Sequence, residues 1–407
     1  MKQQYSLIAF VVFLSLLVRN NQRQSKKLSA SLQSSIIQRE KSRRSDGVEL
    51  VTVEHLSKHV SIKSPTAEFG SKTRSQVTRR GKEKDISYPP LSSLVQEKII
   101  IADVDFLLDF AIAGFAKTGT TTLARRYFEK HPEIAIPHDE IYHLKERKPA
   151  EMVRLLHRLN PRKNIKRGYK APRDIADSRI LDMYDKYWPS AKLIVGIRHP
   201  VEWFNSFYNY RLRFNISMPP AEYLTGECLF EMPQSERLSL YAQRGTRLDD
   251  RGVCANLARY HDHLSLMGKT NISDPAEDSL LWSGRRQRLA SRAPIHNQVF
   301  LYEVSQLGDN NISRLEIFLH DLQHYLSLRD PFILPSRQQQ FDYRKDLFNI
   351  CDDKYFKLRE TLVQNGKEAS TWIQDYFMNH PEVTVSSPDH FRELLDRWQV
   401  DPCTTRK

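Results

Sequence analysis

The chain has 407 residues, 40% of them hydrophobic, which is enough for one large domain with a substantial core plus extensions. Its formal net charge is +13, but residues 19–90 alone hold 16 Lys or Arg against 7 Asp or Glu, a balance of +9. The four cysteines form no Cys-x-x-Cys pair and no histidine cluster accompanies them, which argues against a zinc site. We expect no bound metal and interpret the basic region as a solvated tether, so no nucleic-acid partner is expected.

The N-terminus carries a short apolar segment. Residues 5–18 are apolar or small, and fourteen residues are fewer than the ~20 that span a typical bilayer, so they match a signal-peptide core or a short signal anchor. No Ala-x-Ala cleavage site follows. We predict an uncleaved type II anchor with residues 1–4 as a cytosolic tail; a cleaved signal peptide, and hence a secreted protein, is the alternative. Residues 19–94, rich in Ser, Gln, Lys and Arg, are predicted to form a disordered stem.

A strand, a turn and a helix are predicted over residues 110–128. The turn reads Gly114-Phe115-Ala116-Lys117-Thr118-Gly119-Thr120-Thr121-Thr122, after an apolar run and before a helical pattern. Such a corner suits a phosphate, because glycines let the backbone approach the anion and amide groups at the helix start point at it. Lys117 adds a point charge and the threonines add hydroxyl donors. An ordinary strand-turn-helix corner is the alternative.

The position of the lysine indicates which kind of phosphate loop this is. A nucleotide-hydrolysing P-loop has its lysine after the second glycine, whereas Lys117 precedes Gly119. The turn instead resembles the 5′-phosphosulfate loop of the sulfotransferases, which bind the sulfuryl donor 3′-phosphoadenosine 5′-phosphosulfate (PAPS). The resemblance implies that the donor is bound by Lys117, Thr118, Gly119, Thr120, Thr121 and Thr122.

A short strand at 134–136 is followed by Asp139 and Glu140, on the side where α/β sheets place their sites. Sulfuryl transfer to a hydroxyl needs a base and a nearby cation, because the acceptor loses a proton and charge develops on the leaving phosphate. Lys117 is the expected cation. Either carboxylate could also be a solvated group at a strand end.

The same stretch is similar to a segment of the Golgi carbohydrate sulfotransferases of the heparan type, where a catalytic glutamate follows His-Pro and a strand. Glu140 matches that glutamate. The family often has His two positions later; here Tyr142 takes that place and His143 follows, which leaves His143 as an alternative base. Tyr169-Lys170-Ala171-Pro172 resembles the family's Lys-Ser/Thr-Pro segment, so Lys170 would orient Glu140 or the acceptor hydroxyl. An exposed strand-edge lysine is the other interpretation.

A second donor motif is predicted at the next strand. Residues 192–197 form a run of branched residues typical of a buried strand, Arg198 follows it, and Pro200 suits the first turn of a helix. This resembles the family's 3′-phosphate motif, an Arg at a strand end and a Ser eight positions later, which implies that Arg198 and Ser206 bind the 3′-phosphate. A solvated Arg and Ser at a helix start is the alternative.

The remaining elements continue the alternation of strands and helices. Strands are predicted at 167–172 and 298–303, and helices over 175–188 and from residue 313. Residues 219–297 have much charge and little period, so we expect an insertion over the site, either a lid or a surface that recognises the acceptor. Residues 349–373 resemble the family's closing helix and turn, with a loop near Gly366. The pattern predicts an α/β, P-loop-like three-layer fold with a central parallel sheet flanked by helices, in a sulfotransferase domain at 95–407.

Several features are typical of a lumenal domain. An even number of cysteines in a secretory protein suggests disulfides, and of three connectivities we favour Cys228–Cys254 with Cys351–Cys403; free buried thiols are the alternative. Glycosylation sequons begin at Asn215, Asn271 and Asn311.

Together with these features, the resemblance implies a PAPS-dependent sulfotransferase, anchored in the Golgi membrane, that modifies a hydroxyl or amine of a carbohydrate acceptor. Two other functions stay open. A P-loop kinase or NTPase is disfavoured by the position of Lys117 and by Arg198 where a magnesium-binding Asp would stand. A non-catalytic protein could hold acidic glycans through the basic stem.

Overall fold

The computed structural model describes residues 89–159, 165–214, 218–226, 253–269, 293–334 and 347–404. The chain divides into two compact units, Met1–Lys82 and Glu83–Lys407, and every described residue lies in the second. The predicted cytosolic tail, the apolar segment and the stem as far as residue 88 lie outside the described residues. Among the residues that are described, no helix is long and apolar enough to cross a membrane.

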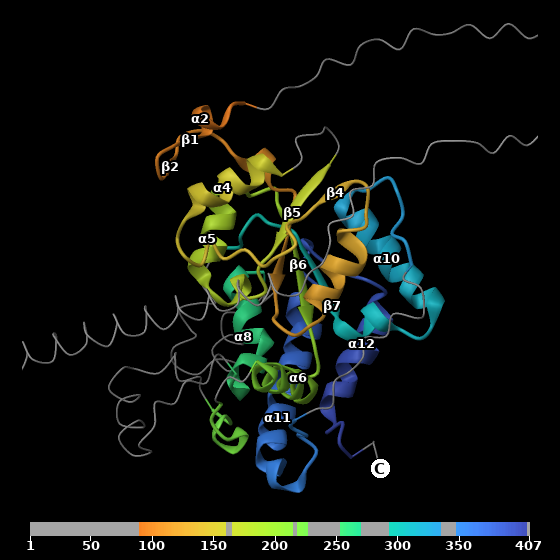
Figure 1. The fold of residues 1–407 in the computed structure, drawn as a ribbon. Coiled ribbons are helices and arrows are strands. Elements are labelled where there is room, and N and C mark those ends of the chain that lie inside the picture. Colours follow the sequence, from red (N-terminus) through yellow and green to blue (C-terminus); the bar gives the residue numbers. More distant parts are fainter. Residues whose placement is uncertain are drawn as a thin grey trace, which may run out of the picture. The chain divides into compact units, whose positions relative to one another are not determined.

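A parallel sheet of six strands forms the centre of this unit (Figure 1), in the order β4-β5-β3-β6-β7-β8. The strands are β3 (Phe110–Gly114), β4 (Ile134–Ala135), β5 (Lys166–Lys170), β6 (Lys192–Ile197), β7 (Val299–Glu303) and β8 (Val383–Val385). A separate antiparallel pair, β1 (Val95–Gln96) with β2 (Ile99–Ile100), precedes the sheet. Because β3 lies between β5 and β6, the segments that follow these three strands meet at one edge of the sheet.

Both faces of the sheet are covered by helices. The side chains of β3 alternate between two hydrophobic cores: Ala111 and Ala113 belong to one, and Phe110 and Ile112 to the other. Helices α4, α5, α6 and α11 pack on the first face, and the helix after β3 packs with α10 on the second. The three-layer α/β fold predicted from the sequence is therefore confirmed.

The helices follow the strands in the order that the sequence predicts. They are α2 (Leu91–Leu94), α3 (Thr120–Thr122), α4 (Pro149–Arg158), α5 (Ser178–Tyr187), α6 (Pro200–Arg213), α8 (Tyr260–Leu264), α10 (Ile312–Leu326), α11 (Phe356–Trp372) and α12 (Pro388–Asp396). A turn of π-helix, η2 (Leu123–Phe128), continues α3. Helix α2 falls inside the range predicted as stem, and its Leu94 is buried against the domain core.

Two predictions about the second half of the chain are wrong for the residues that the structure describes. Within the predicted insertion, the described segment 253–269 is core: Val253 and Tyr260 are fully buried, and the Tyr260 ring contacts that of Trp398 at 5.6 Å between centroids. This segment consists of short 3-10 turns and one short helix whose side chains are buried in several directions. Its hydrophobic residues therefore follow no single helical or strand spacing. Gly366 lies inside α11 rather than in a loop, at a point where a Cβ would lie 3.1 Å from the Trp398 carbonyl oxygen.

Candidate functional site

The loop between β3 and α3 has a tightly turned backbone. Lys117 and Gly119 have positive φ values of 68° and 83°. Glycine tolerates this conformation, and a Cβ at Gly119 would also lie 2.6 Å from a side-chain carbon of Leu307. Gly119 is the N-cap of α3, so the turn delivers the first amide groups of the helix to the carboxyl edge of the sheet.

The four threonines of this loop take different positions. Thr118 is fully buried and donates its hydroxyl to a carbonyl within the loop at 2.7 Å, so its side chain braces the turn and leaves only its backbone for an anion. Thr121 lies at the surface, where its hydroxyl accepts a hydrogen bond from the Lys170 ammonium at 3.1 Å. Thr120 is buried and Thr122 is half-buried.

Direct contacts fasten this loop to the end of β6. The backbone N–H of Phe115 donates to the Gly196 carbonyl at 2.9 Å, and the indole N–H of Trp203, on α6, donates to the Ala116 carbonyl at 2.8 Å. Gly196 allows this close approach, because a Cβ there would lie 2.7 Å from the Thr118 hydroxyl. The loop that holds Lys117 and the strand end that holds Arg198 thus form one rigid corner.

Arg198 leaves the tip of β6 and is 26% exposed. A guanidinium nitrogen lies 3.6 Å from a carboxylate oxygen of Glu202, which is longer than a hydrogen bond. Within the described part of the chain its Nε is buried without a hydrogen-bond partner, so the guanidinium retains a donor for an anion such as a phosphate. Ser206 is half-buried two turns into α6, and no described residue hydrogen-bonds its hydroxyl.

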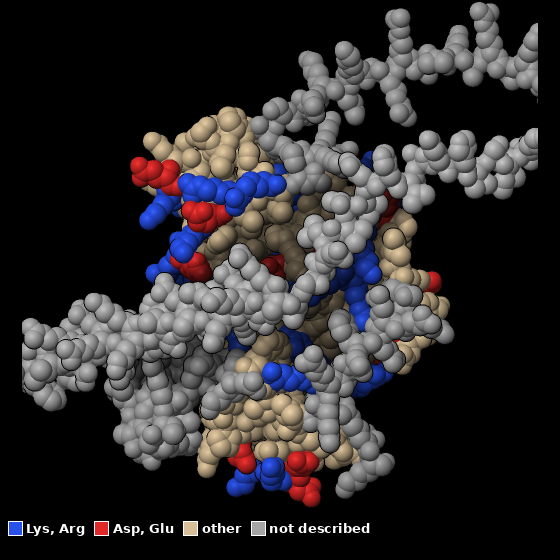
Figure 2. All heavy atoms as spheres, viewed as in Figure 1, with Lys and Arg blue, Asp and Glu red and all other residues tan. Residues whose placement is uncertain are grey.

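The Lys117 ammonium is surrounded by other charges. Burial, followed by the charges of Arg198 and Arg213, lowers the pKa of Lys117 to about 8, while Glu140 acts in the opposite direction. The ammonium also lies 4.2 Å from the centroid of the Tyr210 ring. A group of like charges at one corner favours an anionic ligand, and Figure 2 shows Lys and Arg side chains beside a hollow on the face drawn.

Glu140 is held by two neighbours. One carboxylate oxygen lies 3.4 Å from the Lys170 ammonium, and the other accepts a hydrogen bond from the Tyr142 hydroxyl. Burial, with this hydrogen bond to Glu140, raises the pKa of Tyr142, so the phenol stays protonated as the donor. The side chain of Lys170 is 5% exposed, so the interpretation of an exposed strand-edge lysine is wrong. Through Thr121, Lys170 connects Glu140 to the loop after β3.

His143 is not part of this group in the structure. Its side chain is half-buried. The Lys148 ammonium lowers the pKa of Glu146, and His143 adds to this to a smaller extent. No described contact joins it to Lys117, Glu140 or Lys170.

The structure adds residues that sequence reasoning missed. Tyr210 lies four positions after Ser206 on α6, so the helical period places the two on one face. Trp203 was read only as part of a helix, although it supports the loop. The sequence places Tyr142 two positions after Glu140, which could have suggested a contact between them. The hydrogen bond itself is visible only in the structure.

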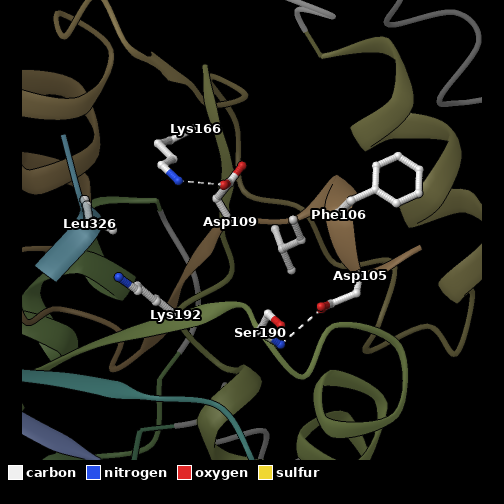
Figure 3. Close-up of a pocket in the computed structure, with 8 residues that line it drawn as sticks. Asp105, Phe106, Asp109, Lys166, Ser190, Lys192 and Leu326 are labelled. Carbon is white, nitrogen blue, oxygen red and sulfur yellow. Dashed lines mark hydrogen bonds and ion pairs between the residues drawn. The ribbon is translucent and has the colours of Figure 1, made fainter. Parts of the chain in front are cut away.

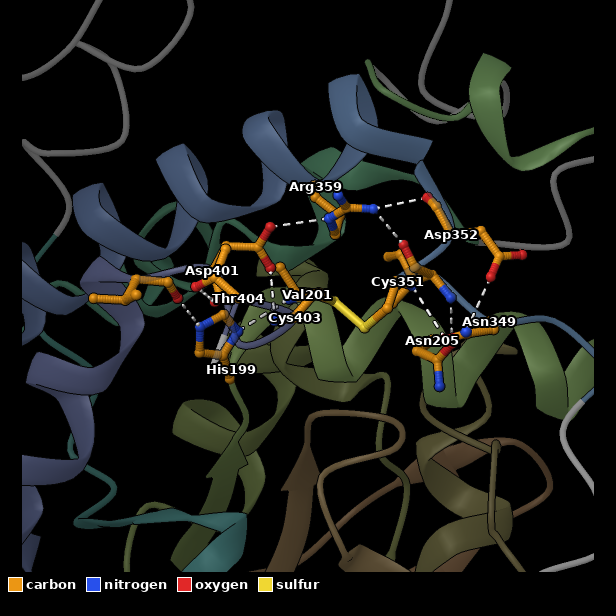
Figure 4. Close-up of a disulfide and its surroundings, with 12 residues drawn as sticks. His199, Val201, Asn205, Asn349, Cys351, Asp352, Arg359, Asp401, Cys403 and Thr404 are labelled. Carbon is orange, nitrogen blue, oxygen red and sulfur yellow. Dashed lines mark hydrogen bonds and ion pairs between the residues drawn. A yellow bond between two sulfur atoms is a disulfide. The ribbon is translucent and has the colours of Figure 1, made fainter. Parts of the chain in front are cut away.

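Only some of the predicted secretory features fall within the described residues. Cys351 and Cys403 form a disulfide, as predicted, with their Cα atoms 5.3 Å apart (Figure 4). The Cys228–Cys254 pairing involves a cysteine outside the described residues. Asn311 is exposed as the N-cap of α10. The sequons at residues 215 and 271 lie outside the described ranges.

A cavity of about 250 Å³ lies at the opposite edge of the sheet (Figure 3). It is lined by Asp105, Phe106, Leu108, Asp109, Lys166, Ser190, Lys192 and Leu326. Lys166 and Lys192 are the first residues of their strands, and Lys166 pairs with Asp109 at 3.1 Å. The cavity therefore belongs to the amino ends of the strands and not to the site. Within the described ranges, no group of three or more His, Cys, Asp or Glu could hold a metal ion.

Comparisons with known proteins find similarity to solved structures alone. No protein-family model matches the chain, and no curated protein matches it by sequence. Among solved structures, a sulfotransferase from Alicyclobacillus acidocaldarius is similar at 17% sequence identity and a TM-score of 0.37, over 65% of this chain and 95% of that chain. At this level of similarity, the function must be argued from the site itself.

Proposed function

We propose that this protein is a sulfotransferase that takes a sulfuryl group from PAPS and transfers it to a hydroxyl or amine of a carbohydrate. The observation that carries the proposal is the corner at which the Lys117 loop and the Arg198 strand end are fastened together. PAPS carries a phosphosulfate at the 5′ position and a phosphate at the 3′ position of one ribose. Two cationic groups fixed at one sheet edge suit these two anionic ends.

The loop and the strand tip divide the donor between them. The amide groups at the start of α3 and the Lys117 ammonium hold the 5′ end, and the Arg198 guanidinium, with its free Nε donor, holds the 3′-phosphate. The Ser206 hydroxyl is available to the same phosphate. When bound, PAPS supplies an activated sulfuryl group with a phosphate as leaving group.

Glu140 is the proposed base. Its carboxylate takes the proton from the acceptor oxygen as that oxygen bonds to sulfur and the bond from sulfur to the 5′-phosphate oxygen breaks. Lys170 and Tyr142 orient the carboxylate, and Lys117 lies beside the oxygen on which negative charge develops. His143 stays the alternative base named from the sequence.

The acceptor and the compartment are inferred from weaker features. A sugar ring has apolar C–H faces that stack on aromatic rings, and Tyr210 is partly exposed beside Lys117. The Cys351–Cys403 disulfide and the exposed Asn311 sequon suit an oxidising lumen. With the apolar segment at 5–18 as anchor, the enzyme would be a single-pass type II protein of the Golgi membrane, or a secreted one if that segment is cleaved.

Calorimetry with 3′-phosphoadenosine 5′-phosphate (PAP), the donor product, tests the donor site. Arg198→Ala should weaken PAP binding at least about tenfold, because a charge-assisted hydrogen bond contributes about 1.5–3 kcal/mol. Arg179→Ala is the matched control, since Arg179 is an exposed arginine paired with Asp177 on α5. Unchanged PAP affinity in Arg198→Ala would exclude the assigned phosphate site.

Labelled PAPS with a panel of glycans and peptides then tests turnover. Glu140→Gln should bind PAP as the wild type does and lose transfer, because the amide cannot take the proton. A fully active Glu140→Gln enzyme would remove Glu140 as base. Magnesium-dependent ATP hydrolysis without sulfuryl transfer would favour the NTPase instead.

A further inference from the structure

His199, which lies between Arg198 and α6, uses both nitrogens of its ring. Nδ1 accepts the backbone N–H of Val201 at 3.2 Å, so the proton of the neutral ring is on Nε2, which donates to the Val400 carbonyl at 3.1 Å. The ring is 7% exposed, and burial lowers the pKa of His199, which favours this neutral form. The residue directly after Arg198 is therefore bound to the C-terminal end of the chain.

The segment that supplies this carbonyl is itself anchored. We call residues 400–404 the C-terminal strap. Asp401 accepts a hydrogen bond from the Arg359 guanidinium at 2.9 Å, and Cys403 is bonded to Cys351 (Figure 4). The same guanidinium donates to the Ile350 carbonyl at 2.8 Å. Arg359 and the disulfide thus join the strap to the segment before α11.

That second segment is bound to α6 as well. The backbone N–H of Ile350 donates to the Asn205 side chain at 3.1 Å, and Asn209 exchanges hydrogen bonds with Phe348 at 2.7 and 2.9 Å. Asn205 and Asn209 lie on either side of Ser206 in sequence. Helix α6 is therefore held at its start through His199 and in its middle through these two asparagines, by segments that the disulfide links.

Arg198 depends on this support, because its own side chain has little that fixes it. Its contact with Glu202 is 3.6 Å long and its Nε is unpartnered among the described residues. The backbone at residues 198–200 therefore sets the point and direction from which the Arg198 side chain starts, at its Cα–Cβ bond. That backbone is set by the His199 ring and by Pro200, which packs against α11.

We propose that His199 and the C-terminal strap position Arg198 for the 3′-phosphate of the donor. The inference rests on the proposed function, and His199 acts as a positioning residue that need not touch the donor. Its specific consequence is that loosening the strap weakens the 3′-phosphate contact more than the 5′-phosphate contact, which belongs to the Lys117 loop and meets α6 through Trp203.

The chain contains a matched control. His131 has the same arrangement as His199: it precedes a proline, its Nδ1 accepts the N–H of Glu133 at 3.2 Å, and its Nε2 bonds to the Asp330 carbonyl at 2.9 Å. It is 5% exposed, close to the 7% of His199. His131 lies before β4, at the other side of the sheet from β6, so its replacement disturbs an equivalent bond without touching the strap.

The experiment compares PAP with adenosine 5′-phosphate (AMP), which lacks the 3′-phosphate, by calorimetry on the full chain. Asparagine keeps a helix-capping oxygen and is too short to reach Val400. In His199→Asn the ratio of the AMP to the PAP dissociation constant should fall about three- to tenfold, because misplacing Arg198 costs part of the free energy of a charge-assisted hydrogen bond. The affinity for AMP should stay within about twofold of the wild-type value. His131→Asn should keep the wild-type ratio.

Other outcomes overturn the inference. A wild-type ratio in His199→Asn, or an equal loss of affinity for both nucleotides, contradicts the positioning role while the proposed function stands. A wild-type protein with no preference for PAP over AMP contradicts the proposed function itself. If His199→Asn does not fold, replacing Cys351 and Cys403 together by Ser, with His199 intact, decides by the same ratio: a wild-type ratio overturns the inference and a reduced one supports it.

Discussion

The perturbed Lys117 ammonium makes donor binding depend on pH in a way that can be calculated. Burial and the charges of Arg198 and Arg213 lower the pKa of Lys117 to about 8 in the free protein. A bound donor brings phosphate charges next to the ammonium and should restore its pKa to above about 10. Binding then takes up a proton wherever the free lysine is neutral, so affinity must fall as the pH rises through about 8.

The magnitude follows from the two pKa values. The neutral fraction of Lys117 in the free protein is about one tenth at pH 7 and about nine tenths at pH 9. PAP affinity should therefore fall about tenfold over this range, equivalent to about 1.4 kcal/mol. The phosphates of PAP have second pKa values of about 6, so they contribute little above pH 7.

Calorimetry in buffers of different ionisation heat measures both consequences. At pH 8 binding should take up about half a proton, since about half of Lys117 is neutral before binding. Lys117→Arg keeps a permanent charge and should make PAP affinity independent of pH between about 7 and 9. An equally pH-dependent Lys117→Arg protein, or a wild-type affinity that stays flat from pH 7 to 9, would refute the reasoning.

Three further predictions concern the same corner and the core beneath it. Trp203→Phe removes the bond to the Ala116 carbonyl and should weaken PAP binding several-fold in calorimetry, with a loss of about 1 kcal/mol in urea unfolding; unchanged affinity would contradict it. Tyr210→Ala should raise the acceptor KM and Tyr210→Phe should not, measured by sulfuryl transfer, because the ring face is the contact. Burial raises the pKa of Asp174 to about 7, so this group contributes stability that is present below about pH 4 and is lost as the pH rises through about 7. Urea unfolding at several pH values should show that Asp174→Asn removes this loss; an unaltered pH dependence would contradict the assignment.

The positions of the two segments proposed to bind the donor could be predicted from sequence, because the signals are local. A buried strand, a glycine turn and a helix start are adjacent in the chain, and each leaves a signal of composition at fixed spacing. The same holds for Arg198, which directly follows a run of branched residues. Neighbouring parallel strands then bring the two segments to one edge, as the structure has them.

The support of the site could not be predicted in this way, because it comes from contacts across long separations. The bond between His199 and Val400 joins residues that are 201 positions apart. The segment 253–269 was read as part of an insertion because residues 219–297 show no clear hydrophobic period, yet Tyr260 is fully buried. A loop was predicted near Gly366 because residues 349–373 resemble the family's closing helix and turn, whereas Gly366 lies inside α11, where a Cβ would lie 3.1 Å from the Trp398 carbonyl oxygen.

Helix α6 connects the two halves of the proposed reaction. Ser206, on the donor side, and Tyr210, beside Lys117, are one turn apart, and the asparagines at 205 and 209 hold the same turns to the segment before α11. A displacement of α6 would therefore move a donor contact and an acceptor contact together. Substitutions in Asn205 or Asn209 should raise the KM for both substrates, whereas substitutions in the loop after β4, which carries Glu140 but no donor contact, should change turnover alone. A kinetic separation of this kind would distinguish the helix that positions both substrates from the loop that supplies the base.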